Sequence, residues 1–157
     1  MKIDLLFVGK TDNSYLKEGI LIYNKRLSHY TNISIVEIPD IKSAASLSES
    51  QIKEREADSI LKRVGENDFL VLLDEHGKML SSVEFANSIE SHLIRGTKKV
   101  IFVIGGAYGF ADRVYKRADN KISLSKMTFS HQMVRLILVE QIYRAFTILK
   151  GEPYHHK

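Results

Sequence analysis

The chain has 157 residues, of which 44% are hydrophobic and 27% charged, and it contains no cysteine. This is the composition of one globular domain, and it excludes a disordered chain, a disulfide framework, a thiolate metal site and a cysteine nucleophile. The net charge of +4 is unevenly distributed, because residues 1–94 hold 11 Lys and Arg against 15 Asp and Glu, whereas residues 95–157 hold 12 against 4. A basic half of this kind favours binding to nucleic acid or another polyanion.

Short apolar segments alternate with helical patterns along the whole chain. In chain order we predict strand 3–8, helix 12–27, strand 33–38, helix 50–64, strand 69–73, helix 81–93, strand 100–104, helix 111–117, strand 122–124 and helix 131–150. Residues 43–50 are small and polar and predict a mobile loop, and residues 74–77 predict a turn. The alternation predicts a single α/β domain over residues 1–157, with a mainly parallel sheet and flanking helices.

The apolar segments are all short. The one at the N-terminus is interrupted by Asp4 and is too short for a signal peptide, and the longest run elsewhere, residues 100–104, could not cross a bilayer. We therefore expect a cytoplasmic protein with no membrane partner.

Ligands of parallel α/β sheets bind beyond the carboxyl ends of the strands, which here are Leu73, Gly105 and Leu124 onward. The glycine-rich residues 105–109 allow a ligand to approach the backbone closely. They do not match G-x-G-x-x-G, and no acidic residue follows about 20 positions later, so a dinucleotide site is disfavoured. A plain tight turn and a site for a small nucleotide-like ligand both remain open.

Residues 124–132 connect the last strand to the last helix and combine hydroxyls, apolar side chains and His131. Such a loop could form a pocket for a flat base. It could equally serve as a helix start, with Ser130 as the N-cap and Phe129 packed beside it.

The last helix is apolar around most of its circumference, which predicts burial on several sides: one face on its own sheet and another on a second subunit. Arg135 lies within the main apolar arc, so it either finds a buried partner or extends to solvent. Glu140 and Arg144 are spaced for an ordinary surface ion pair.

Residues 152–157 at the C-terminus are typical of a frayed end. Their Tyr154 and His155 are nevertheless side chains that could stack on a base or carry a proton. The neighbouring His156 makes two adjacent histidines, but no carboxylate completes a set of metal ligands, so no metal is expected.

The order of motifs resembles a known family over the whole chain. The matching segments are residues 3–9, 23–27, 36–39, 77–78, 102–106, 123–129, 131–135, 140–145 and 153–155. They resemble the small bacterial SPOUT-class methyltransferases that methylate N3 of a pseudouridine in large-subunit (23S) ribosomal RNA.

The resemblance implies that residues from about 69 onward form a deep trefoil knot, a rare exception to the rule against threaded chains. It implies a homodimer that acts on the assembled ribosome, at the stem-loop facing the small subunit. The cofactor implied is S-adenosylmethionine, contacted by Leu73, Gly105, Leu124, Ser125, Lys126, Met127, Thr128 and Phe129.

The catalytic groups that the resemblance indicates are His131, Arg135, Tyr154 and His155. We expect Tyr154 and His155 to contact the target base and Arg135 to hold the pocket or a phosphate. The chain departs from the family at His156, where some members have Arg, and at residues 106–109. Two alternatives are a non-catalytic ribosome- or rRNA-binding factor and a dinucleotide-dependent oxidoreductase.

Overall fold

The computed structural model describes residues 1–156 and contains five strands and six helical segments. In chain order these are β1 (Lys2–Val8), α1 (Ser14–Leu27), β2 (Asn32–Ile38), η1 (Ala44–Ser46), α2 (Glu49–Leu61), β3 (Phe69–Met79), α3 (Ser82–Ile94), β4 (Lys99–Ile104), α4 (Asp112–Arg117), β5 (Asn120–Ser123) and α5 (Met133–Leu149). The strands form one sheet in the order β2-β1-β4-β3-β5, and each neighbouring pair is parallel. The predicted α/β class with a parallel sheet is confirmed.

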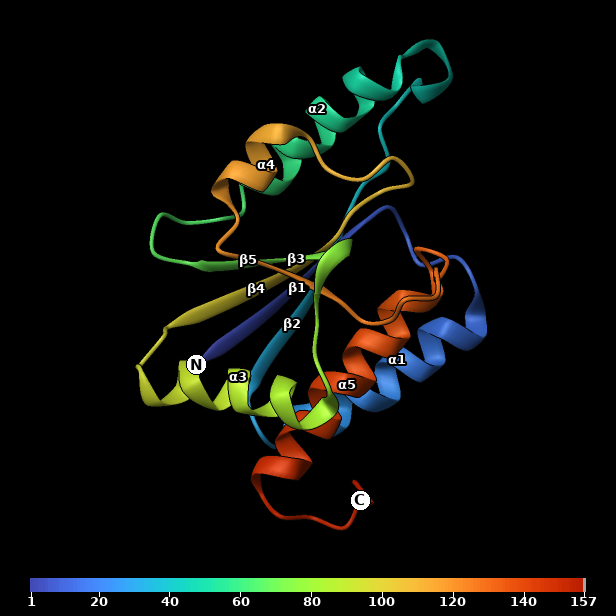
Figure 1. Cartoon of the computed structure of the whole chain (residues 1–157). Coiled ribbons are helices and arrows are strands. Elements are labelled where there is room, and N and C mark those ends of the chain that lie inside the picture. The colour runs from blue at the N-terminus through green and yellow to red at the C-terminus, as the bar shows by residue number, and fades with distance from the viewer. Residues whose placement is uncertain (157) are drawn as a thin grey trace.

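Helices cover both faces of this sheet, with α2 and α4 on one side and α1, α3 and α5 on the other (Figure 1). Side chains of β1 alternate between the two sides, as a strand requires. Leu5 and Phe7 pack in the core with α1, α3 and α5, whereas Leu6 and Val8 pack in the core with α2 and α4. The continuous apolar strands of the sequence are therefore explained by burial on both faces.

The predicted turn at residues 74–77 is wrong. The strand β3 continues to Met79, and its pairing with β5 shifts register between Leu73 and Lys78. The backbone of β5 passes so close that a Cβ atom on Gly77 would lie 2.5 Å from the carbonyl carbon of Ile122. Polar residues and a glycine here mark an irregular strand and not a chain reversal.

Helix starts follow the sequence closely. Ser81 and Glu84 form a capping box at the start of α3, which was predicted to begin at residue 81, and Ser48 and Gln51 form a second one at the start of α2. The predicted loop at residues 43–50 thus contains η1 and the beginning of α2. The N-cap expected at Ser130 is wrong, because α5 begins at Met133 with Gln132 in the N-cap position. The Ser130 hydroxyl still accepts from the Met133 N–H at 3.1 Å, in the turn that precedes the helix.

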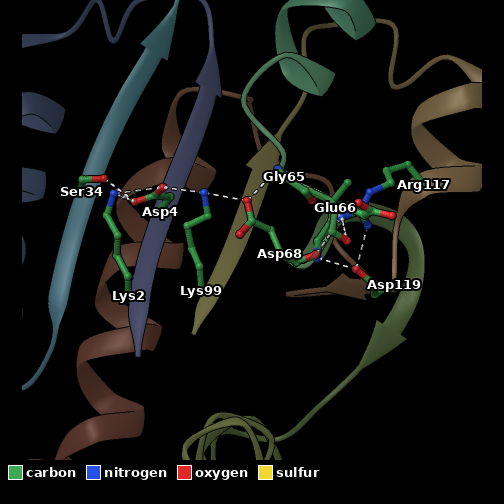
Figure 2. Close-up of polar contacts among 10 residues, drawn as sticks. Lys2, Asp4, Ser34, Gly65, Glu66, Asp68, Lys99, Arg117 and Asp119 are labelled. Atoms are coloured by element: carbon green, nitrogen blue, oxygen red, sulfur yellow. Dashed lines mark hydrogen bonds and ion pairs between the residues drawn. The ribbon is translucent and has the colours of Figure 1, made fainter. Parts of the chain in front are cut away.

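A polar network joins the amino ends of the strands, at the edge of the sheet opposite the glycine-rich loop (Figure 2). Lys99 pairs with Asp68 at 2.6 Å, and Arg117 donates to the carbonyl oxygens of Gly65 and Asp68. The carboxylate of Asp119 accepts from the Leu70 N–H at 2.7 Å. These contacts fix the start of β3 and leave the carboxyl edge to bind ligands.

Candidate active site

A cavity of about 660 Å³ opens at the carboxyl ends of β3, β4 and β5. Its wall includes seven of the eight residues predicted to hold a cofactor: Leu73, Gly105, Leu124, Ser125, Met127, Thr128 and Phe129. The eighth, Lys126, lies exposed in the same loop and is not part of the wall. The structure therefore brings together three strand ends that span about 50 residues of the sequence.

Acidic and aromatic side chains also reach this cavity, and the sequence did not single them out. Asp74, Glu75 and His76 line it from the irregular part of β3, and Tyr115 lines it from α4. The Tyr115 hydroxyl donates to Asp74 at 2.5 Å, and the His76 N–H donates to the other carboxylate oxygen at 2.8 Å. Burial and the contact with Asp74 raise the pKa of Tyr115 to about 12, so its hydroxyl remains a donor at neutral pH.

The glycine-rich loop is held from behind by a buried carboxylate. Glu56, on α2, is 9% exposed, and a Cβ atom on Gly106 would lie 2.5 Å from its Oε1. Burial raises the pKa of Glu56, a hydrogen bond from the Gly106 backbone lowers it, and the charge of Asp40 raises it, with a net upward shift. A side chain at position 106 would therefore require the Glu56 carboxylate or the loop to move.

Two of the predicted catalytic residues lie near the start of α5. His131 lines the cavity, whereas Arg135 does not. The Arg135 side chain is fully buried and donates through Nη1 and Nη2 to the carbonyl oxygens of Gly9 and Val8. Its Nε donates to the carbonyl oxygen of His131 at 3.1 Å. Arg135 therefore has buried partners, does not extend to solvent, and connects β1 to the residue that enters the cavity.

The other two predicted catalytic residues lie in the C-terminal tail, and the expected fraying is wrong for both, because Tyr154 and His155 contact α5. The Tyr154 hydroxyl donates to Glu140 Oε1 at 2.9 Å and also lies 3.1 Å from the Tyr23 hydroxyl. Burial and these two contacts raise the pKa of Tyr154 well above its usual range. Nδ1 of His155 lies 3.4 Å from Nη1 of Arg144.

The expected pair of Glu140 and Arg144 is present, with 2.6 Å between Oε1 and Nη2. The same carboxylate binds Tyr154, so the ion pair is part of the tail's anchor. Arg144 also lies over the Tyr154 ring, with its guanidinium carbon 4.8 Å from the ring centre. The tail is held by one charged and aromatic cluster.

Within one chain, the cavity lies at the start of α5, whereas the tail folds back from the end of the helix and contacts its middle at Glu140 and Arg144. The cavity includes Val134 at its start, and the tail follows its last residue, Leu149. At 1.5 Å per residue, Glu140 lies about 9 Å along the helix from Val134. The predicted catalytic residues thus form two groups in this chain: His131 with the Arg135 that supports it, and Tyr154 with His155.

Only part of the excess positive charge of residues 95–157 is free to bind a ligand at the carboxyl ends of the strands. Arg113 pairs with Glu54 and Asp58 of the acidic half. Lys99 binds Asp68 at the opposite edge of the sheet. Folding therefore uses these two cations to join the basic half of the chain to the acidic half.

Within residues 1–156, no group of three or more His, Asp and Glu side chains is arranged to hold a metal ion. Over the same residues, no helix combines the length and apolar character needed to cross a membrane.

Comparison with known proteins gives a family match over residues 1–155, to a model described as predicted SPOUT methyltransferase. Three relatives, each named ribosomal RNA large subunit methyltransferase H, align over 157 residues, the full length of this chain and of the relative. They come from Christiangramia forsetii, Parabacteroides distasonis and Flavobacterium johnsoniae, at 56%, 54% and 53% identity.

Proposed function

Because the chain belongs to the SPOUT methyltransferase family, we propose that it methylates N3 of a pseudouridine in large-subunit ribosomal RNA, using S-adenosylmethionine. The names of relatives that match it from end to end support ribosomal RNA as the substrate. The substrate we propose is the assembled ribosome, at the stem-loop facing the small subunit, so the enzyme works in the cytoplasm. The observation that carries the proposal is the single cavity formed by the three strand ends in a chain of this family.

The residues of the cavity suit S-adenosylmethionine. Leu73, Leu124 and Phe129 offer apolar surface for a flat base, and the 105–109 loop offers backbone groups. The carboxylates of Asp74 and Glu75 at the same cavity favour a positively charged ligand. When bound, this cofactor would supply a methyl group from a positively charged sulfur, and the sulfur would keep the electron pair of the broken S–C bond.

We also propose that residues from about 69 onward form a deep trefoil knot. The close approach of Gly77 in β3 to the backbone of Ile122 in the paired strand β5 supports this, because it packs two distant segments with no side chain between them. A knot of this kind would hold the three cavity loops in a fixed relation without a second domain.

The methyl acceptor, N3 of pseudouridine, is an imide N–H. It becomes nucleophilic as its proton passes to a base and its electron pair forms the new bond to the methyl carbon. His131 is the histidine in the cavity wall nearest the start of α5, which makes it a candidate for this proton. Arg135 serves as a positioning residue, because its Nε donates to the carbonyl oxygen of His131 and its side chain is fully buried.

Tyr154 and His155 complete the site only in a homodimer, in our proposal. Their side chains contact Glu140 and Arg144 on α5, and neither residue lines the cavity of its own chain. Two copies packed with their α5 helices antiparallel would bring the tail of one beside the cavity of the other. Exposed apolar side chains on α1, Tyr15, Leu21 and Ile22, supply surface for such packing.

Removing residues 153–157 tests the catalytic part of this proposal. We expect the shortened protein to bind S-adenosylmethionine normally by calorimetry and to lose methyl transfer to ribosomes. Normal methylation by the shortened protein would show that the tail has no catalytic role.

A second measurement tests the activity itself. Mass spectrometry of ribosomal RNA from cells lacking this protein should reveal one lost methyl group on a pseudouridine. Calorimetry that gives no saturable heat with S-adenosylmethionine, together with an unchanged RNA, would support a non-catalytic ribosome-binding factor.

A further inference from the structure

A second cavity, of about 280 Å³, adjoins the first. It lies between the start of α3 and the middle of α5, where Ser82 and Gln141 contribute to its wall. The two cavities share Ile122, Ser123 and Leu124, so the end of β5 is a common wall. A molecule in the second cavity would therefore lie next to a ligand in the first.

The second cavity has the size and lining for one small flat ring. Its volume is near the lower limit of ligand pockets, which begin at about 300 Å³. Leu80, Phe85 and Ile137 provide apolar surface, and the hydroxyl of Ser82 and the amide of Gln141 provide polar groups. This combination of flat apolar contact and a few fixed polar atoms is typical of a base-binding site.

A chain of hydrogen bonds fixes the orientation of the Gln141 amide. The Gln141 Nε2 donates to Glu140 Oε2 at 2.8 Å. A carboxylate can only accept, so the nitrogen of the amide must face Glu140 and the oxygen must face the other way. On that side the Ser82 hydroxyl donates to Gln141 Oε1 at 3.1 Å. Since Glu140 also binds Tyr154, the chain continues from the cavity to the tail.

This orientation gives the cavity wall an excess of acceptors. The Ser82 hydrogen is used by Gln141, so Ser82 Oγ offers its lone pairs. Gln141 Oε1 keeps one lone pair beyond the bond from Ser82. A base with N–H groups along its edge complements such a wall. Pseudouridine carries two ring N–H groups, at N1 and N3, whereas uridine carries its ribose on N1 and has only the N3 hydrogen.

We propose that the second cavity receives the target base, and that Gln141 Oε1 and Ser82 Oγ select pseudouridine over uridine by accepting from its N1–H. This inference rests on the proposed methylation of pseudouridine and assigns its specificity to two residues. In the pseudouridine ring N1 and N3 are separated by C2, so a hydrogen bond from N1–H leaves N3 free to receive the methyl group.

The test compares ribosomes that carry pseudouridine at the target with ribosomes from cells lacking the pseudouridine synthase, which carry uridine. We expect the unaltered enzyme to prefer pseudouridine. Gln141→Leu should lower kcat/KM on pseudouridine by about tenfold and reduce the preference by a similar factor, because an acceptor for N1–H is lost. Activity on uridine should change little, and the affinity for S-adenosylmethionine should not change.

Ser82→Ala provides a second and milder variant, with the same direction of change and full folding expected from thermal unfolding. Ser91→Ala is the matched control, because Ser91 lies on the same helix and donates only to the carbonyl of Ser88. If Gln141→Leu and Ser82→Ala retain the preference for pseudouridine, the inference is overturned while the proposed function stands. If the unaltered enzyme binds the cofactor but methylates neither ribosome, the proposed function fails and the inference falls with it.

Discussion

The guanidinium of Arg135 lies beneath the end of β1, where its Nη2 donates a 2.7 Å hydrogen bond to the carbonyl oxygen of Val8. Its Nη1 donates to Gly9 and to the Thr11 hydroxyl, each at 3.0 Å. Arg135→Met would leave these buried acceptors without a donor. We expect it to lower the free energy of unfolding, measured with urea, by about 2–4 kcal/mol.

Arg135→Lys should recover little of this stability, because an ammonium group cannot reproduce the planar fork that reaches several carbonyls. Arg95→Met, at an exposed arginine, should change stability by less than about 0.5 kcal/mol. A fully stable Arg135→Met protein that lost only methyl transfer would contradict the positioning role and favour direct contact with substrate.

Gly77 and Gly96 each favour glycine for a different reason, a close neighbour at Gly77 and the backbone conformation at Gly96. A methyl group on Gly77 would collide with the backbone of Ile122, whereas Gly96 has φ +70° and no atom within 4 Å of the added group. Gly77→Ala should therefore destabilise by about 2–3 kcal/mol, and Gly96→Ala by about 1 kcal/mol. Thermal unfolding measures both, and equal losses would show that β5 can move away from Gly77.

The sheet was predictable because its strands are continuous apolar segments, which are stable only when both faces are covered. The strand-end rule then located Leu73, Gly105 and Leu124 in one cavity. The extension of β3 was missed because residues 74–77 have the composition of a turn. Its structure depends on pairing with Ile122, which local sequence does not encode.

Other parts of the site arise from packing between distant elements. Glu56 meets Gly106 only because α2 packs on the sheet, and Tyr115 meets Asp74 only because α4 does. A helix over residues 50–64 was predicted, but no local pattern marks Glu56 as part of the site. The Tyr154 contact with Glu140 was likewise missed, since a terminal tyrosine carries no periodic signal.

His92 makes stability depend on pH. Its ring centre lies 4.3 Å from that of Phe69, and burial, with a smaller contribution from Arg95, lowers its pKa against the opposing charge of Asp119. The folded state thus favours the neutral ring. Its contribution is complete above the unfolded pKa of about 6.5 and is lost as the pH falls toward the lower folded value.

We expect the free energy of unfolding to fall between pH 7 and pH 5 less steeply in His92→Leu than in the unaltered protein, as measured by urea titration at each pH. His29→Gln, at an exposed histidine, should retain the original slope. Identical slopes for all three proteins would exclude His92 as the source.

Gly106 and Glu56 should be energetically coupled. Gly106→Ala places its methyl group within 2.5 Å of the Glu56 carboxylate, so we expect the loop to shift and the affinity for S-adenosylmethionine to fall about tenfold. Glu56→Ala removes the obstacle, and the double variant should bind better than Gly106→Ala alone. Calorimetry on the four proteins gives the coupling, and purely additive effects would contradict the contact.

Tyr154→Phe separates the anchoring of the tail from its chemistry. The ring can still pack on Tyr143, whose centre lies 4.8 Å away, but the bonds to Glu140 and Tyr23 are lost. We expect a stability loss of about 1 kcal/mol, unchanged affinity for S-adenosylmethionine and a loss of methyl transfer of more than about tenfold.

The matched control for this variant is Tyr30→Phe, which removes a 2.6 Å bond from the Tyr30 hydroxyl to Glu152 in the same tail. It should cost similar stability, because the acceptor is also a carboxylate. Methyl transfer should persist in this control if Tyr154 acts on the base through its own hydroxyl. Equal losses of methyl transfer in the two variants would mean that both tyrosines only hold the tail in place, and that the proton must be handled by His155 or His131.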